Sequence, residues 1–311
     1  MSSTTQHRAT PSGGAPDDIK LGSGRPKWLL PLLGALVVAI VAAVVLVRAG
    51  GGSDAQAVDG SHFSNEFEVA YQASSASERR ILEYLNEEIA PDYGVTIKPV
   101  GIEDGNQLDQ ATADGKYIAN IYQHKHWLAQ VVDKTGWKLS ALGPVFQWSY
   151  SVYSDKYASL DELPQGAKVA LLNDPANTAQ ALWILERAGK LTFKDGVNPW
   201  EATENDIADN IGGYEFTYVD YGAGPRVLPE VDAVIAYNMQ FRAAGVPDEQ
   251  RIYAPAAPLE FAGQLVIGTD YLDDPQIEKL KQVFFDPRVQ EHLATTDDPE
   301  LEGQLSKVSD S

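Results

Sequence analysis

The 311-residue sequence contains no cysteine. This absence excludes disulfides, thiolate metal ligands, a thiol nucleophile and the attachment of a lipid to a cysteine side chain. Histidine is also scarce, with five residues, and the sequence has no Gly-x-Ser-x-Gly elbow, P-loop, His-Glu-x-x-His pair or calcium-loop spacing. We therefore expect neither an enzyme nor a bound cofactor or metal.

Basic residues are few, with 24 lysines and arginines against 44 aspartates and glutamates, and the formal net charge is -20. Residues 1–53 carry a net charge of +3, from five basic and two acidic side chains, so the remainder carries -23. So acidic a body repels phosphate backbones, and no basic stripe or zinc-finger spacing offsets this repulsion. We expect no nucleic-acid partner.

The sequence has one long uncharged run, residues 28–47, which as a helix is about 30 Å long and matches a bilayer core. Arg25 and Lys27 precede it, so the positive-inside tendency places the N-terminus in the cytoplasm and the rest outside. We predict a single-pass anchor in the cell membrane and an extracytoplasmic body. A cleaved signal peptide is the alternative, because the small residues 49–57 resemble a cleavage site.

Composition divides the rest of the chain. Residues 1–27 are rich in Ser, Thr, Gly and Pro and are predicted to be disordered, and residues 48–64 are predicted to form a flexible tether. From residue 65, short β-type runs alternate with helical patterns in two successive series, which predicts a mostly parallel α/β structure built from two units. Phe146–Ser154 is predicted to be one long strand. Ligands of such structures bind beyond the carboxyl ends of strands, often between units.

The stretch YIANIYQHKHWLAQ predicts one such strand end. The strand should end near Gln123, so Tyr122, Gln123 and His124 lie where a pocket wall would form, and imidazole and amide groups suit a polar ligand. Two alternatives remain, because His124 could cap the following helix or form a metal site with His126. A His-x-His pair without further clustered ligands is a weak metal signal, and His126 fits a solvated helix residue.

The stretch NDPANTAQAL follows the predicted strand KVALL and begins a helix. Asn173, Asn177 and Gln180 could face a ligand there, and free N–H groups at a helix N-terminus favour anions. An ordinary helix capped by Asp174 and Pro175 explains the same residues equally well.

A third polar residue, Asn238, follows the predicted strand VDAVIAY. Asn238 could bind a ligand or cap the next helix. Three polar strand ends in two adjoining α/β units favour a ligand-binding cleft more strongly than any one of them.

The segments QHKHWL, GPVFQWSYSVYSDKYASLDELPQGAKVALLNDPAN, ALWILERAGKL and VDAVIAYN, in this order, resemble the NlpA/MetQ family, the substrate-binding proteins of methionine ABC importers. The resemblance implies a two-lobed type II periplasmic-binding-protein-like fold, an ABC permease as partner, and lobe closure over one small molecule, by default methionine. It assigns residues 65–154 and 238–296 to the first lobe and 155–237 to the second. Residues 297–311 are then a flexible acidic tail.

The resemblance also implies that His124, Asn238 and residues 173–180 lie in the pocket. Two positions depart from the family pattern. Gln180 stands where an arginine usually binds the ligand carboxylate, and Gly105 stands where an aromatic is usual. An amide lacks the charge-assisted clamp of a guanidinium, so the ligand is expected to be bulkier or to lack a free carboxylate, with Tyr122 or Trp148 as the stacking surface. A ligand sensor or scaffold that lost transport is the alternative function.

Overall fold

The computed structural model describes residues 60–309, which belong to one compact unit. The predicted disordered segment 1–27, the predicted anchor 28–47 and most of the predicted tether 48–64 lie outside these residues. Between residues 60 and 309, no helix is both long enough and apolar enough to cross a membrane.

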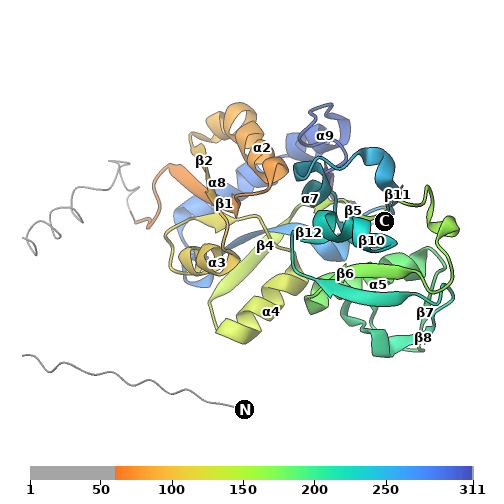
Figure 1. The fold of residues 1–311 in the computed structure, drawn as a ribbon. Coiled ribbons are helices and arrows are strands. Elements are labelled where there is room, and N and C mark those ends of the chain that lie inside the picture. Colours follow the sequence, from red (N-terminus) through yellow and green to blue (C-terminus); the bar gives the residue numbers. More distant parts are fainter. Residues whose placement is uncertain (1–59, 310–311) are drawn as a thin grey trace, which may run out of the picture. The chain divides into compact units, whose positions relative to one another are not determined.

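The first lobe is built on a six-stranded mixed sheet (Figure 1). Three neighbouring strands are parallel, and the other three pair antiparallel beside them. In spatial order the strands are β13 (Leu305–Ser306), β4 (Leu139–Trp148), β12 (Ala262–Gly268), β3 (Ala119–Asn120), β1 (Glu66–Gln72) and β2 (Thr96–Ile102).

Helices cover this sheet because their apolar residues recur at helical spacing. In α2, Ile81 and Leu82 are buried, and the π-helical turn that continues the helix buries Leu85 and Ile89. Pro287 separates two helices, since one ends at Phe284 and the next begins at the proline. The helices are α2 (Ala76–Tyr84), the π turn (Leu85–Ile89), α3 (Gly105–Ala113), α4 (Lys125–Thr135), α8 (Pro275–Phe284) and α9 (Pro287–Thr295).

The second lobe is built on a five-stranded sheet whose central strand, β10, is buried along its whole length. Its strands, in spatial order, are β11 (Arg251–Tyr253), β5 (Tyr150–Tyr153), β10 (Ala233–Tyr237), β6 (Lys168–Leu172) and β9 (Glu215–Val219). A small ribbon of β7 (Thr192–Phe193) and β8 (Ile207–Asp209) and the helices α5 (Pro175–Arg187), α6 (Gly224–Val227) and α7 (Asn238–Ala243) complete it.

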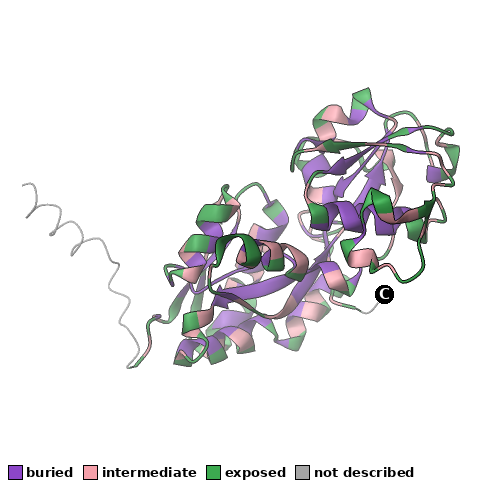
Figure 2. Ribbon diagram, turned by 90° about the horizontal axis from the view of Figure 1, so that it is seen from below, coloured by how far each residue is buried: buried purple, intermediate pink, exposed green. Residues whose placement is uncertain are grey.

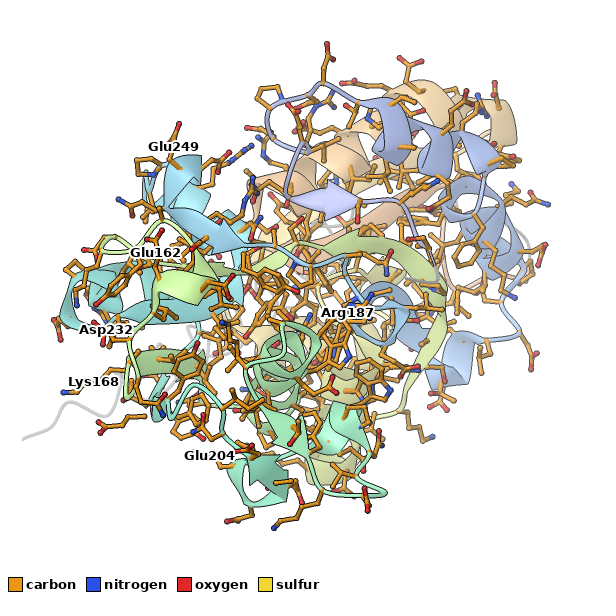
Figure 3. The ribbon with its side chains drawn as sticks, turned by 90° about the vertical axis from the view of Figure 1, so that its right-hand side faces the viewer. Glu162, Lys168, Arg187, Glu204, Asp232 and Glu249 are labelled. Carbon is orange, nitrogen blue, oxygen red and sulfur yellow. The ribbon has the colours of Figure 1, made fainter. Side chains whose placement is uncertain are left out.

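Each lobe has its own buried interior, and its charged side chains lie at the surface. Figure 2 shows the inner strands of each sheet as buried ribbons inside separate lobes, with exposed residues on the edge strands and on the outer helices and loops. Charged side chains of the second lobe, including Lys168, Glu204 and Glu249, lie at its periphery (Figure 3). The acidic surface is therefore solvated, as the composition predicts.

The structure corrects the predicted long strand Phe146–Ser154 and, with it, the lobe boundaries. The chain breaks at Ser149, so that β4 belongs to the first sheet and β5 to the second. The Ser149 N–H donates to Gln304 O at 2.9 Å, and its carbonyl accepts from Asn238 N at 3.0 Å, which satisfies the backbone between the sheets. Residues 150–154 and the strand β11, predicted in the first lobe, therefore belong to the second.

The C-terminal segment also differs from the predicted loose acidic tail 297–311. Leu301 and Leu305 are buried, and β13 pairs with β4. The Ser309 N–H donates to Gln147 Oε1 at 2.9 Å. Two leucines four residues apart supply enough apolar surface to hold this acidic segment against the first lobe.

Candidate ligand-binding site

A cavity of about 260 Å³ has walls from both lobes. Eight of its fourteen lining residues end, or follow within two residues, the strands β1, β2, β3, β6, β9 and β10, so the cavity lies at the carboxyl ends of these strands in both sheets. The first lobe contributes Gln72, Glu103, Gly105, Tyr122, Gln123, His124, Trp127 and Trp148, and the second contributes Asn173, Asp174, Asn177, Tyr221, Tyr237 and Met239.

His124 is the N-cap of α4. Its Nδ1 accepts the backbone N–H of Trp127 at 3.1 Å, so the proton of the neutral ring lies on Nε2. The side chain is 3% exposed, and burial lowers its pKa to about 3, while His126 lowers it further and Asn177 raises it. Near neutral pH, His124 is therefore an uncharged N–H donor on the cavity wall.

Gln123 and Tyr122 are held by a buried carboxylate that no sequence pattern indicates, Asp109. Gln123 Nε2 donates to Asp109 Oδ1 at 2.6 Å, Asn120 Nδ2 donates to the same oxygen at 3.3 Å, and the Tyr122 hydroxyl donates to Oδ2. Burial raises the pKa of Asp109 to about 6, and these hydrogen bonds partly oppose the shift. Gln123 Oε1 is a buried acceptor without a partner within residues 60–309, and it belongs to a side chain that lines the cavity.

A second buried carboxyl group, Glu78, lies behind the same wall. Its Oε2 accepts the Gln72 N–H at 2.9 Å, and its own N–H donates at 3.2 Å to Oγ of Ser75, the N-cap of α2. Burial raises the pKa of Glu78 to about 8, opposed by interactions with Gln72, Ser75 and Trp148. Trp148 thus lies near Glu78, but the indole N–H makes no hydrogen bond of ordinary geometry to any described residue. This N–H is a second neutral donor on a cavity-lining side chain.

The second-lobe wall is organised by the N-terminus of α5. Asp174 Oδ1 accepts the Asn177 N–H at 2.9 Å, and Oδ2 accepts Asn177 Nδ2 at 2.8 Å. Asn177 Oδ1 in turn accepts the Tyr237 hydroxyl at 2.7 Å, and Asn173 Nδ2 donates to Asp220 at 2.6 Å. Asp174 and Asn177 therefore hold each other rigidly in place at the cavity surface.

The cavity lining includes six of the eight predicted site residues: Tyr122, Gln123, His124, Trp148, Asn173 and Asn177. Gln180 and Asn238 do not line it. Gln180 is buried within α5, and its Oε1 has no partner in the described part of the chain. Asn238 braces the region between the lobes, since its Nδ2 donates to Gly303 O at 2.9 Å.

Gly105 lies against the Tyr122 ring, and a Cβ at this position would meet that ring at 3.3 Å. Tyr122 therefore supplies aromatic surface next to the position where the resemblance expects an aromatic side chain.

Sequence reasoning missed several wall residues. Glu103 and Tyr221 follow β2 and β9, so the strand-end rule could have identified them, and Gln72 is the last residue of β1. Trp127 and Met239 also line the cavity, and no sequence pattern pointed to either.

The alternative of a His124–His126 metal site gains no further ligands. Within residues 60–309, no group of three or more His, Asp or Glu side chains could hold a metal ion. His126 Nε2 instead contacts Glu260 Oε2 at 3.1 Å, outside the cavity lining.

Two α/β lobes around a cavity at the carboxyl ends of their strands are typical of extracytoplasmic solute-binding proteins. Residues 69–302 match the family model of the NlpA lipoproteins. The chain belongs to this family and is a substrate-binding protein of the NlpA/MetQ type.

Individual relatives agree with this assignment. Outer membrane lipoprotein 2 of Mannheimia haemolytica is 31% identical over 193 residues, 62% of this chain and 70% of the relative. The D-methionine-binding lipoprotein MetQ of Escherichia coli is 28% identical over 218 residues, covering 69% and 80% of the two chains. A nutrient binding protein from Burkholderia cenocepacia, solved bound to methionine, has a TM-score of 0.65 at 28% identity, covering 77% of this chain and 98% of that one.

Proposed function

We propose that this protein is the membrane-anchored, extracytoplasmic solute-binding component of an ABC importer, which captures an amino acid or a related small molecule by lobe closure. The observation that carries the proposal is the cavity whose walls come from both lobes at the carboxyl ends of their strands. Relatives that are named for D-methionine binding, and a similar structure with methionine bound, support a ligand of amino-acid size.

Six of the predicted residues are proposed to contact the ligand. His124 and Trp148 donate neutral N–H groups, Gln123 accepts through Oε1, and Tyr122 supplies an aromatic face. Asn173 and Asn177 contribute from the second lobe, although Asn177 is also committed to Asp174 and Tyr237. Gln180 and Asn238 act indirectly, by shaping α5 and the region between the lobes.

Closure is proposed to occur about the two places where the chain passes between the sheets. One is Ser149, and the other is the segment 254–261 between β11 and β12. Two such connections allow the lobes to rotate as rigid bodies, because only a few backbone angles need to change.

Attachment to the membrane is proposed to depend on residues 28–47. Relatives carry the name lipoprotein, but this sequence has no cysteine to carry a lipid. A transmembrane helix would hold the binding domain near an ABC permease. Alkaline extraction of membranes should leave the full chain in the pellet, whereas recovery of a shortened chain in the soluble fraction would favour cleavage.

The test of ligand capture is native mass spectrometry of the full chain, purified in mild detergent without refolding. We expect one small molecule to co-purify with the wild-type protein and with His126→Ala, and to be lost from His124→Ala. His126 is a matched control because it lies two residues away and outside the cavity lining. Retention of the molecule by His124→Ala would contradict the proposed site.

Uptake separates transport from the sensor or scaffold alternative. Cells that lack this protein should import the co-purified compound more slowly than cells that express it. Unchanged uptake together with retained binding would contradict the importer role and favour sensing.

A further inference from the structure

The charged groups at the cavity are all acidic. Among the described residues, the cavity lining contains no lysine or arginine, whereas Glu103 and Asp174 both line it. Asp109 and Glu78 lie directly behind the first-lobe wall, bonded to Gln123 and to the Gln72 backbone. Arg226 lines the adjoining groove of about 560 Å³, but it is not part of the cavity lining.

The polar donors on the wall are neutral. His124 is an uncharged imidazole, and the Trp148 indole N–H is a buried neutral donor without a hydrogen-bond partner in the described part of the chain. The N-terminus of α5 would ordinarily favour an anion, but its first residue, Pro175, has no N–H group and the Asp174 carboxylate already accepts the Asn177 N–H. A ligand carboxylate would therefore gain only neutral hydrogen bonds and would be repelled by Asp174.

The wall is also rich in aromatic rings that attract cations. Tyr122, Trp127, Trp148, Tyr221 and Tyr237 all line the cavity. The Trp148 and Tyr237 centroids are 5.9 Å apart in an edge-to-face pair, and those of Tyr221 and Tyr237 are 6.1 Å apart. Rings of this kind attract an ammonium group through their electron-rich faces, and the attraction is stronger in a desolvated site.

Two further features favour a cationic ligand: the Gln123 acceptor that has no partner and the negative charges near Tyr221. Gln123 is 1% exposed, and its Oε1, unbonded within residues 60–309, belongs to a lining side chain, where it can accept from an N–H donor. Tyr221 is partly exposed, and its pKa is raised by desolvation and by the negative charges of Glu78, Glu103 and Asp174.

We infer that the ligand is an organic cation: a small amine with an apolar side chain whose carboxyl group is absent or masked as an amide or ester. The inference rests on the proposed solute-binding function and narrows its ligand class. The ammonium group of this ligand would lie among the aromatic rings, between Glu103 and Asp174 and near Gln123 Oε1. Where the ligand carries an amide or ester, its carbonyl oxygen would accept a hydrogen bond from His124 or Trp148.

Matched ligand pairs test this inference. Calorimetric titration of the full chain in mild detergent at about pH 6.5, where the amines are protonated, would compare methionine, leucine and phenylalanine with their amides and decarboxylated amines. We expect at least one amide or amine to bind at least tenfold more tightly than its parent amino acid. A free amino acid that co-purifies, or that binds as tightly as its amide, overturns the inference but leaves the proposed function intact. A chain that co-purifies with nothing and binds none of these compounds contradicts both.

A charge variant tests the same inference on the protein. Asp174→Asn keeps the helix cap, since asparagine caps as well as aspartate, but removes the negative charge. Affinity for the cation should fall about tenfold with little change in melting temperature. Asp270→Asn is the matched control, because Asp270 is an exposed partner of Lys138 away from the cavity. Equal cation affinity in Asp174→Asn and Asp270→Asn would overturn the inference.

Discussion

Two helices begin at the cavity, one from each lobe, and their N-caps differ. His124 caps α4 and accepts the Trp127 N–H through Nδ1, whereas Asp174 caps α5 and accepts the Asn177 N–H through Oδ1. Both caps come after a strand that pairs in parallel with at least one neighbour, β3 with β1 and β6 with β9 and β10, and both line the cavity. The local geometry is the same, but one cap is neutral and the other is an acid.

The difference shows which cap is explained by folding alone. Aspartate is among the preferred N-cap residues, so the start of α5 needs no ligand to account for Asp174. Histidine is not, and at this position it is almost completely buried in its uncharged form. An unusual cap on a cavity wall is therefore stronger evidence for binding than a common one.

The largest expected effect is the pH dependence that Glu78 gives to the first-lobe wall. Its pKa in the folded state is about 8, above its ordinary value of 4.5. Between these two pH values, Glu78 is therefore protonated in the folded state and ionised in the unfolded state. The stability contributed by Glu78 is complete below pH 4.5 and is lost as pH rises through about 8. The loss is on the order of 3 kcal/mol or more.

The pKa shift of His124 has the opposite sign, so its effect on stability also runs in the opposite direction with pH. Its folded pKa of about 3 lies below its ordinary value of 6.5, so its contribution is present above pH 6.5 and is lost as pH falls toward 3. Between pH 6.5 and 8 only the Glu78 effect remains of these two. Denaturant unfolding in this window should show stability falling with pH in the wild type but nearly constant in Glu78→Gln, which imitates the protonated acid. Parallel slopes for both proteins would show that Glu78 is not protonated in the folded state.

The next largest expected effect is the loss of ligand affinity in the variant His124→Asn. His124→Asn keeps a capping side chain and removes the imidazole, so ligand affinity should fall by about ten- to a hundredfold while the cap itself survives. Titration with the co-purified compound and a thermal melt would measure both effects. His126→Asn serves as the control and should bind normally. A loss of stability as large as the loss of affinity would mean that His124 is structural.

Much of the fold can be predicted because its elements carry local signals. The parallel strands are apolar runs, and the helices are marked by their spacing and by caps such as Asp174 and Asp286. The strand-end rule and the family resemblance together predict six of the wall residues. The strand-end rule works because parallel strands bring their carboxyl ends to one edge of a sheet.

The remaining features depend on contacts between distant segments, which no local pattern encodes. The break at Ser149 exists because Gln304 and Asn238 bind its backbone. Asp109 appears in the sequence as an ordinary helix residue, and only the fold places it against Tyr122 and Gln123. For the same reason Gln180, one turn beyond the lining residue Asn177, could not be assigned to the interior of the lobe.

A smaller effect is expected from Tyr237, which supports the second-lobe wall. Tyr237→Phe removes the hydroxyl that donates to Asn177 Oδ1 and leaves that acceptor without its partner. We expect a loss of about 1–2 kcal/mol in stability and a severalfold loss of affinity. Denaturant unfolding and titration would measure these. Tyr218→Phe, on the exposed face of β9, is the control, and an effect there as large as at Tyr237 would contradict the proposed support.

The smallest expected effect concerns the capping role of Asp174 itself. Asp174→Ala removes the acceptors for the backbone N–H and for Nδ2 of Asn177 and should cost about 1 kcal/mol or more, whereas Asp174→Asn keeps the acceptor for the backbone N–H and should cost less. Affinity for a cationic ligand should fall equally in both variants, because both remove the charge. Thermal melts and titrations of the pair therefore separate capping from binding at one residue. If affinity followed stability across the two variants, Asp174 would act only as a cap, and the contrast with His124 would reduce to a difference in folding.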